Sequence, residues 1–551
     1  MQANLQMRKE LMVGIIVLMT AGTSILSSVT SVQAFTKENR MIGYQSETVG
    51  SDGIVFSGKT VYVDDNNTNG PWDGSPEHPY RYLQDGVNAS RSGDTVYVFS
   101  GTYSCSNITM NRKSIQLLGE NQDTTFFYGY ISISHAHAFR ISGLTFRSYP
   151  VSVNWEDFLY ISSCVRFTIT NDTFEIVGAQ KTEVFAIAIT QSSGWVISHN
   201  MFRNVGNGLA DWIEAVTVFN YRIEENTFVS KFFDYAIMVA LTAGGTIRGN
   251  RLISTLASPA DTGINVGTSV FVNISDNYIN FTRAGITVGG NPFLTRKILV
   301  MNNTLINCHD GGIALISTSD SIVTKNYVSG GQESILLLFL CERNLIYKNA
   351  FENTYTPIYG AVMIEAGSCL NRVIANQISG NVYGVWIAPT APDFPQPLNR
   401  FHLNNFERNY RDGIDYYLSL WYKPTGLFHG VGNYWDNYTG VDKNGDGIGD
   451  TPYTIPGYER KDRYPLIKPV DIKNVTECDE EVSISMRTMN RGATTYDVAL
   501  LKQLVKILPQ TVLKPQSLKA MLLQENNRIS RRVVTSGSRT LDMIFNRMRN
   551  F

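Results

Sequence analysis

Short segments that alternate apolar and polar residues return at regular intervals along the middle of the chain. One phrase reads apolar-x-x-Asn-x-apolar, as in Ile223-Glu-Glu-Asn226-Thr-Phe, and weaker copies end at Phe146 and Phe174. Self-similarity at a fixed period is typical of repeat architectures. Successive Asn residues of the phrase are 23 to 28 residues apart: Asn200, Asn226, Asn250, Asn277, Asn303, Asn326, Asn349, Asn376 and Asn404.

A second phrase, small-apolar-x-apolar, occurs between the first ones. Both phrases have period two and many β-branched residues, so they predict strands. Strands this short, with no helical crossover, do not form an α/β sheet, but stacked coils can pair like strands in parallel, about 4.8 Å apart. The pattern therefore predicts an all-β parallel β-helix of about eleven to thirteen coils. Copies of the second phrase begin at Ala236, Gly263, Gly285, Gly312, Ala361 and Gly384.

The repeated Asn has a structural interpretation. It follows a strand, where we expect the left-handed backbone conformation that Gly and Asn tolerate best. Stacked from coil to coil, its amide can bond the next Asn as a ladder. We therefore nominate none of these residues for catalysis.

The two ends of the chain have other patterns. Strands at Val61–Asp64 and Asp94–Val98 flank a short predicted helix, Tyr82–Ser90, that would cover the first coil. From Cys478 onward the repeat stops, and the tail holds 12 Lys and Arg against 6 Asp and Glu. Within it, residues Asp497–Leu508 have helical periodicity.

Several motifs at the ends resemble a known family. The opening Tyr62-Val-Asp-Asp and Gly93-Asp-Thr-Val-Tyr-Val are similar to the start of pectin-lyase-like β-helix proteins. The closing Gly432-Asn-Tyr-Trp-Asp-Asn-Tyr and Asp462-Arg-Tyr-Pro-Leu resemble the NosD-like branch of that family. The resemblance covers about residues 60–467.

The resemblance implies a right-handed parallel β-helix that binds carbohydrate or hydrolyses sugars, and the NosD name also implies a role in copper delivery. Fold analogy alone does not establish an activity. We divide the chain into a signal peptide or membrane anchor (1–34), a linker (35–59), the β-helix with its caps (60–467) and a basic, partly helical tail (468–551).

Charge and targeting signals restrict the partners. The formal net charge is −1, which gives no electrostatic footprint for a nucleic acid. Arg8 and Lys9 precede the apolar run Leu11–Met19, and Val32-Gln-Ala34 resembles a signal-peptidase site, so we expect export or anchoring at the cell surface. Nine Asn-x-Ser/Thr sequons fit a glycosylated exported chain. Six scattered cysteines define no disulfide framework and favour buried thiols.

The most specific local motif is a calcium-loop pattern near the end of the repeats. Oxygen-bearing side chains stand at positions 1, 3, 5 and 9, a glycine stands at position 6, and position 7 would offer its carbonyl. The pattern departs at position 12, where Tyr453 stands in place of the usual Glu. We expect a structural calcium ion, and a plain Asp/Asn/Gly turn is the alternative. The candidate ligands are Asp442, Asn444, Asp446, Ile448 and Asp450.

Candidate catalytic residues come from aligning the coils. Asp234, Asp261, Arg283 and Asp310 each stand two residues before the second phrase in successive coils, so stacking should bring them about 5 Å apart. Hydrolysis or β-elimination of an acidic polysaccharide would use one carboxyl as acid, another as base or metal ligand, and Arg283 to neutralise a uronate. Ordinary turn chemistry of Asp is the alternative.

Two aromatic residues and one His pair complete the candidates. Trp386 points outward in the second phrase and could stack on a sugar ring, and Tyr359 continues the line of aligned positions. His135-Ala-His137 would place two imidazoles on one strand face, which suits copper or zinc, although a polar pair fits as well. Three functions stay open: a polysaccharide-binding protein or enzyme, a non-catalytic surface protein, and a copper-delivery accessory.

Overall fold

The computed structural model describes residues 56–491, except 105–106, 149–155, 178–183, 207–209, 232, 256–259, 291–293, 357–358, 366, 389–397, 417–418, 426–428 and 458–459. These residues belong to one compact unit that begins at Thr48. The predicted signal segment, the linker up to residue 55 and the predicted helix at 497–508 lie outside them. In the described part, no helix is both long and apolar enough to cross a membrane.

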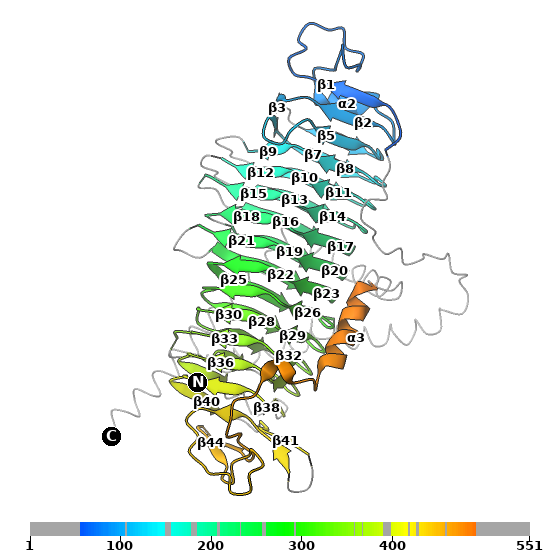
Figure 1. Ribbon diagram of the computed structural model, residues 1–551. Helices are drawn as coiled ribbons and strands as arrows, with labels where there is room; N and C mark the ends of the chain where they lie inside the picture. Colours follow the sequence, from blue (N-terminus) through cyan, green and yellow to red (C-terminus); the bar gives the residue numbers. More distant parts are fainter. Residues whose placement is uncertain are drawn as a thin grey trace, which may run out of the picture. The chain divides into compact units, whose positions relative to one another are not determined.

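The chain forms a right-handed parallel β-helix in which each coil gives one strand to each of three parallel sheets (Figure 1). This confirms the predicted fold class and the stacked coils. We call the sheets A, B and C in the order in which the chain visits them, and we count the strands that the described residues form. Sheet A has 14 strands: β1 (Thr60–Val63), β2 (Thr95–Val98), β5 (Gln116–Gly119), β8 (Arg140–Ser142), β11 (Thr168–Thr170), β14 (Val196–Ser198), β17 (Phe219–Glu224), β20 (Ala243–Arg248), β23 (Val270–Ser275), β26 (Leu299–Met301), β29 (Ile322–Thr324), β32 (Leu345–Tyr347), β35 (Arg372–Ile374) and β38 (Arg400–His402).

Sheets B and C continue each coil after sheet A. Sheet B has 14 strands: β3 (Gly101–Ser104), β6 (Thr125–Tyr128), β9 (Thr145–Arg147), β12 (Thr173–Ile176), β15 (Met201–Asn204), β18 (Thr227–Ser230), β21 (Arg251–Ser254), β24 (Tyr278–Asn280), β27 (Thr304–Ile306), β30 (Tyr327–Ser329), β33 (Ala350–Glu352), β36 (Gln377–Ser379), β39 (Asn405–Glu407) and β43 (Tyr434–Trp435). Sheet C has 13: β4 (Ile108–Asn111), β7 (Ile131–Ser134), β10 (Glu156–Ser162), β13 (Val184–Thr190), β16 (Ala210–Val216), β19 (Tyr235–Ala240), β22 (Ala260–Gly267), β25 (Thr282–Gly289), β28 (Gly311–Ile316), β31 (Ile335–Leu338), β34 (Val362–Ile364), β37 (Tyr383–Ile387) and β40 (Arg411–Asp415).

Other elements close the two ends of the β-helix. The predicted capping helix is present as α2 (Leu83–Ala89), whose Leu83 and Val87 are buried. At the opposite end, two antiparallel pairs follow the last coil: β41 (Lys423–Pro424) with β42 (Gly430–Val431), and β44 (Tyr453–Ile455) with β45 (Arg460–Asp462). A 3-10 turn (Ile472–Asn474) then leads into α3 (Asp479–Asn490).

Helix α3 lies along the outer face of sheet A and runs back toward earlier coils (Figure 1). Its Val482 and Met489 pack with outward side chains of β26 to β35, including Leu299 and Tyr347. One carboxylate before α3 and two in its first turn form ion pairs with Lys and Arg side chains of earlier elements. The N–O distances are 3.0 Å for Glu477 with Lys423, 3.1 Å for Asp479 with Lys348 and 2.7 Å for Glu481 with Arg372.

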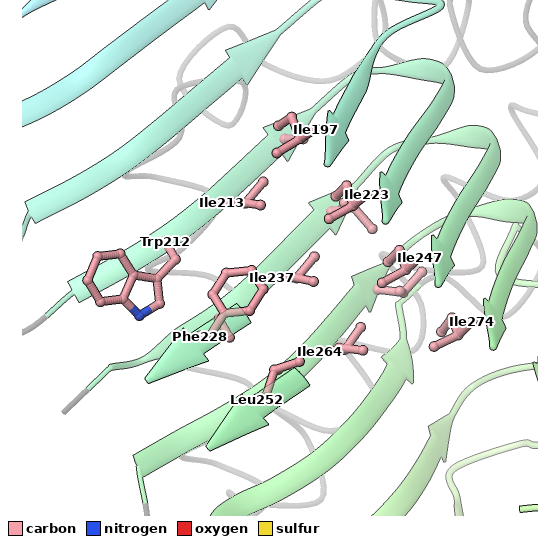
Figure 2. Close-up of a cluster of buried hydrophobic side chains, with 14 of the residues drawn as sticks. Ile197, Trp212, Ile213, Ile223, Phe228, Ile237, Ile247, Leu252, Ile264 and Ile274 are labelled. Atoms are coloured by element: carbon pink, nitrogen blue, oxygen red, sulfur yellow. The ribbon is translucent and has the colours of Figure 1, made fainter. Parts of the chain in front are cut away.

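The core is built from side chains that repeat in register from coil to coil. Ile197, Ile223, Ile247 and Ile274 pair along sheet A, and Ile213, Ile237 and Ile264 pair along sheet C (Figure 2). All seven are at most 1% exposed. Like side chains therefore stack on like side chains, which keeps the interior closely packed as the coils accumulate.

The repeated Asn residues form the predicted ladder in the turn between sheets A and B. Each Asn donates its backbone and side-chain N–H groups to Oδ1 of the Asn in the next coil, and its amide also donates to a backbone carbonyl. In Asn277, the backbone N lies 3.0 Å and the side-chain Nδ2 lies 2.9 Å from Asn303 Oδ1, and the same Nδ2 lies 2.9 Å from the carbonyl oxygen of Ile247. Asn433 extends the ladder by one coil beyond Asn404.

The predicted left-handed conformation belongs to the residue before each ladder Asn from Asn200 to Asn404, so that expectation is wrong by one position. His199, Glu225 and Asp276 have φ of 57°, 56° and 57°, whereas Asn200, Asn226 and Asn277 do not have positive φ. The preceding residue takes the sharp bend, and the Asn side chain can then point inward and bond along the stack.

Both ends of the ladder are carboxyl groups. Asp462 accepts the backbone and side-chain N–H groups of Asn433 at 2.7 and 3.1 Å. Asp172 stands at the other end, where its Oδ1 accepts the Leu144 N–H and its Oδ2 has no hydrogen-bond partner. Burial raises the pKa of Asp462 to about 6 and raises that of Asp172 well above its usual range.

Candidate functional site

The four predicted catalytic positions lie in neighbouring coils at the start of the sheet C strands, as the sequence alignment predicts. Asp261 is the second residue of β22, and its side chain is outside the described set; the side chains of the other three are half-buried. The residues that directly follow these positions pair in register: Tyr235 with Thr262, Thr262 with Ala284, and Ala284 with Gly311. The catalytic role of these residues stays a prediction.

Side-chain contacts join the last two of these positions. Arg283 Nε lies 3.6 Å from Asp310 Oδ2, and His309 Nδ1 contacts the other oxygen of the same carboxylate. These side chains are 36%, 43% and 47% exposed, so the group faces solvent. The Asp310 carboxylate therefore contacts both a guanidinium and an imidazole, and these two contacts hold it in position.

The next coil adds a buried carboxyl that sequence reasoning missed. Glu333 stands two residues before the first residue of β31, Ile335, its carbonyl accepts the Gly312 N–H at 3.0 Å, and the residue is only 3% exposed. Its Oε2 has no hydrogen-bond partner. Burial raises the pKa of Glu333 well above its usual range, and the nearby carboxyls of Asp310 and Glu365 raise it further.

Glu365 and Tyr355 border the same group. Glu365 follows β34, and burial raises its pKa to about 6. Tyr355 is 54% exposed, and its ring lies edge-on to His309 with centroids 6.3 Å apart. Burial raises the pKa of Tyr355, and the carboxyls of Asp310 and Glu333 contribute. We call the set Asp310, Glu333 and Glu365, with Arg283, His309 and Tyr355, the outer carboxyl cluster.

An apolar floor lies beside the outer carboxyl cluster. Leu336, Leu338 and Met363 pack with Tyr359, and all four are at most 8% exposed. Tyr359 therefore contributes to the packed floor rather than presenting an open ring. Burial raises its pKa to about 12, with contributions from Glu333 and Glu365.

Trp386 lies one coil further and faces outward next to Met363. It is half-buried, and its ring is perpendicular to that of Tyr383 at 5.3 Å and tilted against that of Tyr416 at 6.2 Å. Arg411 stands over Tyr383 at 5.8 Å. These side chains form an aromatic group that is suited to stacking on a sugar ring.

The outward line of sheet C also contains an acid that the alignment did not include. In the coil before Met238, the same position is occupied by Glu214, which is 3% exposed. The aligned copies of the second phrase begin one coil later, at Ala236, and so the alignment did not include this acid.

The calcium-loop residues form a tight turn. The Asp442 carboxylate accepts the N–H groups of Gly445 and Gly447 at 2.7 and 2.8 Å. Asp446 Oδ1 accepts the Ile448 N–H at 2.9 Å, and Asp450 accepts the Lys443 N–H at 2.8 Å. Tyr453, at position 12, instead stacks on Trp435 at 4.3 Å and donates to Asp412, so it belongs to the closing core.

His135 and His137 do not share a strand face. They lie in the turn between β7 and β8, both exposed, and His135 has φ of 54°. Within residues 56–491, less the gaps given above, no group of three or more His, Cys, Asp or Glu side chains is arranged to hold a metal ion. Cys164, Cys308, Cys341 and Cys478 are buried free thiols, as the sequence predicted.

The fold and the site thus define a right-handed parallel β-helix with a cluster of carboxyl groups on the outer face of one sheet. Residues 219–440 match the family described as periplasmic copper-binding protein (NosD), which confirms the resemblance of the sequence motifs. No curated protein sequence matches the chain.

Several solved structures are similar. The A-module of mannuronan C-5 epimerase AlgE4 from Azotobacter vinelandii has 14% identity and a TM-score of 0.41, and the alignment covers 65% of this chain and 99% of that module. The PL6 family alginate lyase AlyGC has 14% identity and a TM-score of 0.43, with coverage of 76% and 58%. The periplasmic alginate epimerase AlgG has 12% identity and a TM-score of 0.35, with coverage of 61% and 84%. These similarities concern the fold, and fold analogy alone does not establish an activity.

Proposed function

We propose that this protein binds a polysaccharide across the outer face of sheet C and hydrolyses it at the outer carboxyl cluster. The observation that carries this proposal is that the Glu333 and Asp310 carboxyls lie near each other in different surroundings. Two carboxyls in neighbouring coils have opposite surroundings, since one is buried with an unpartnered oxygen and the other is half exposed beside a guanidinium. Titratable neighbours whose surroundings separate their protonation behaviour are typical of acid and base partners.

The roles follow from these surroundings. Glu333, which its raised pKa keeps protonated, donates its proton to the glycosidic oxygen as the C1–O bond breaks. Asp310 accepts a proton from the water that attacks C1, and the hydroxyl of that water stays on the sugar. Arg283 and His309 hold the Asp310 carboxylate in position. Asp234 and Asp261 stand at the aligned positions of the two preceding coils.

The aromatic group supplies the binding part of the proposal. Trp386 lies in the coil after Met363, and Met363 lies in the coil after Leu336. A sugar chain that runs along the stack would therefore contact the carboxyls and the Trp386 ring about 10 Å apart, which is two coil spacings. Stacking on an aromatic face fixes the orientation of a sugar ring, because its C–H face is apolar.

We also propose that the protein is exported and that it binds calcium in the 442–450 loop. Export is supported by the N-terminal charge and apolar pattern and by the match to a family described as periplasmic. For calcium, the loop directs several carboxylate and amide oxygens into one short turn with glycines at 445 and 447. The ion would have a structural role at the end of the β-helix. Copper fits less well, since the described residues offer no grouped His or Cys ligands.

A polysaccharide screen tests the function. The purified chain is applied to a glycan array, and bound polymers are assayed for new reducing ends and for unsaturated uronates. We expect binding, and reducing ends without unsaturated products. Trp386→Ala should weaken binding, and Glu333→Gln should abolish cleavage while binding persists. Unsaturated products would replace hydrolysis by elimination, and binding without any turnover would leave a non-catalytic surface protein.

A further inference from the structure

The charges around Glu333 indicate which sugar polymers the outer carboxyl cluster can accept. The carboxyls of Asp310 and Glu365 lie near enough to Glu333 to raise its pKa. Its Oε2 is buried and unpartnered. The centre of the cluster is therefore a region of negative potential in surroundings where charges are poorly screened.

The cation that a uronate would need is already engaged. The sequence predicts that Arg283 neutralises the carboxylate of an acidic sugar, but its Nε lies 3.6 Å from Asp310. His309 contacts the same carboxylate. A uronate placed in the cluster would have to compete with Asp310 for both partners, and it would stand beside Glu365 as a like charge. Like charges this close disfavour binding.

The remaining surroundings are apolar or aromatic. Leu336 and Met363 are 8% and 2% exposed and form the floor next to Glu333, and the next coil presents Trp386 with Tyr383. Arg411 stands over the Tyr383 ring at 5.8 Å. Such a surface favours sugar rings that carry hydroxyl groups rather than carboxylates, because hydroxyl groups can use a protonated Glu333 as a hydrogen-bond donor.

On this basis, and given the function proposed above, we propose that the site takes a polysaccharide without carboxylate groups and discriminates against polyuronates. Neutral and amino-substituted sugar chains share this chemistry. The contacts that carry the proposal are the engagement of Arg283 and His309 by Asp310, and the unpartnered Glu333 oxygen between two further carboxyls.

Binding measurements with matched polymers test the proposal. Affinities are measured at pH 7 and constant ionic strength for a neutral set (β-glucan, xylan, galactan), for partly acetylated chitosan, and for polygalacturonate and alginate. We expect at least one carboxylate-free polymer to bind about tenfold or more tightly than either polyuronate. Trp386→Ala should weaken that binding, which assigns it to this face.

A charge-removing variant tests the cause. Glu365→Gln should raise the affinity for polyuronates several-fold and leave the neutral polymers nearly unchanged. Asp310→Asn, which releases Arg283 and His309, should act in the same direction and serves if Glu365→Gln does not fold. Glu352→Gln is the matched control, because Glu352 is a half-buried carboxyl on sheet B that bonds Tyr327. It should change neither affinity.

The failures of the two proposals are distinguishable. If a polyuronate binds more tightly than every neutral or amino polymer and Trp386→Ala removes that binding, the discrimination proposed here is wrong, while the polysaccharide site stands. If no polymer of any class binds, or if Trp386→Ala changes none of the affinities, both the proposed function and this inference fail. Unchanged polyuronate binding in Glu365→Gln and in Asp310→Asn would overturn the electrostatic cause.

Discussion

The turn between sheets A and B and the outer face of sheet C both contain buried polar groups. These groups are hydrogen-bonded in the turn, whereas on the outer face one of them has an oxygen without a partner. In the turn, every ladder Asn from Asn200 to Asn433 has its amide bonded to a neighbouring coil, as for Asn250 and Asn277. On the outer face, Glu333 is buried with an oxygen that has no partner. Repetition satisfies buried polar groups because each coil supplies what the next one needs. A buried polar group that the repeat leaves unsatisfied is costly, and it therefore points to function.

The ladder should be the most sensitive to mutation. Asn277→Ala removes two donated side-chain bonds and the oxygen that accepts from Asn250, which leaves buried backbone groups unpaired. We expect a loss of about 3 kcal/mol or more in the free energy of unfolding, measured by urea denaturation. The exposed Asn474→Ala should cost less than about 0.5 kcal/mol. Equal effects of the two substitutions would contradict the structural role of the ladder.

The carboxyl at position 333 should give the reverse result. Glu333→Gln keeps the shape of the side chain and removes a group that is costly to ionise, so stability should be equal or higher. Cleavage should fall about 100-fold or more, as expected when a general acid is removed. Urea denaturation and reducing-end assays measure the two effects, and Glu352→Gln is the control. A destabilised but fully active variant would place Glu333 among the structural residues.

Asp172 sharpens the comparison, because it is a ladder position that ends in an unsatisfied oxygen. Burial raises its folded-state pKa well above that of the unfolded chain. A raised carboxyl pKa stabilises the protein at low pH, and this contribution is lost as the pH rises from the unfolded-state value toward the folded-state value. Asp172→Asn should therefore be nearly neutral at pH 4 and stabilise by about 1–2 kcal/mol at pH 8, since an amide carries no charge.

The unfolding free energy of wild type and variant, measured at several pH values, checks this prediction. Asp276 is exposed and stands directly before the ladder residue Asn277 in the sequence. As a control, Asp276→Asn should not show the same pH-dependent gain. A constant difference across the pH range would mean that Asp172 does not change its protonation state on folding.

The smallest expected effect concerns the calcium loop. A ligand that binds only the folded state stabilises it by mass action, so about 5 mM calcium should add roughly 1 kcal/mol if the loop binds with sub-millimolar affinity. Asp446→Ala should abolish this increment and leave the strands folded, as followed by thermal denaturation with circular dichroism. If EDTA has no effect on the wild type, the loop is a turn without an ion.

Much of the fold could be predicted, because the same pattern of apolar, polar and Asn positions recurs in successive coils. The period-two phrases, the ladder Asn residues and the capping helix near Leu83 each follow from local rules. The left-handed residue was placed one position too late because sequence shows that a turn exists, but not which residue bends. The partly helical tail is confirmed by α3, but the position of this helix was not predicted, since Val482 and Met489 acquire their role only from contact with sheet A.

The candidate site could be predicted only in part. The alignment found Asp310 and Arg283 because polar residues recur at one position of successive coils. It missed Glu333, which stands one residue later, and His309, which precedes Asp310. Neither repeats in other coils. Their importance comes from burial and from neighbours in space, as for the Glu333 carboxyl between Asp310 and Glu365, and periodicity carries no information about that.

The ladder also bears on how such a molecule can change its length. An Asn in the stack receives hydrogen bonds from one side and gives equivalent ones to the other, so gene duplication of a whole coil would insert a unit that fits both neighbours. Asp462 accepts from Asn433 but, as a carboxylate, has no amide N–H to give to a further coil. One oxygen in place of one NH₂ group thus ends the series, and the number of coils before it fixes the length of the outer face.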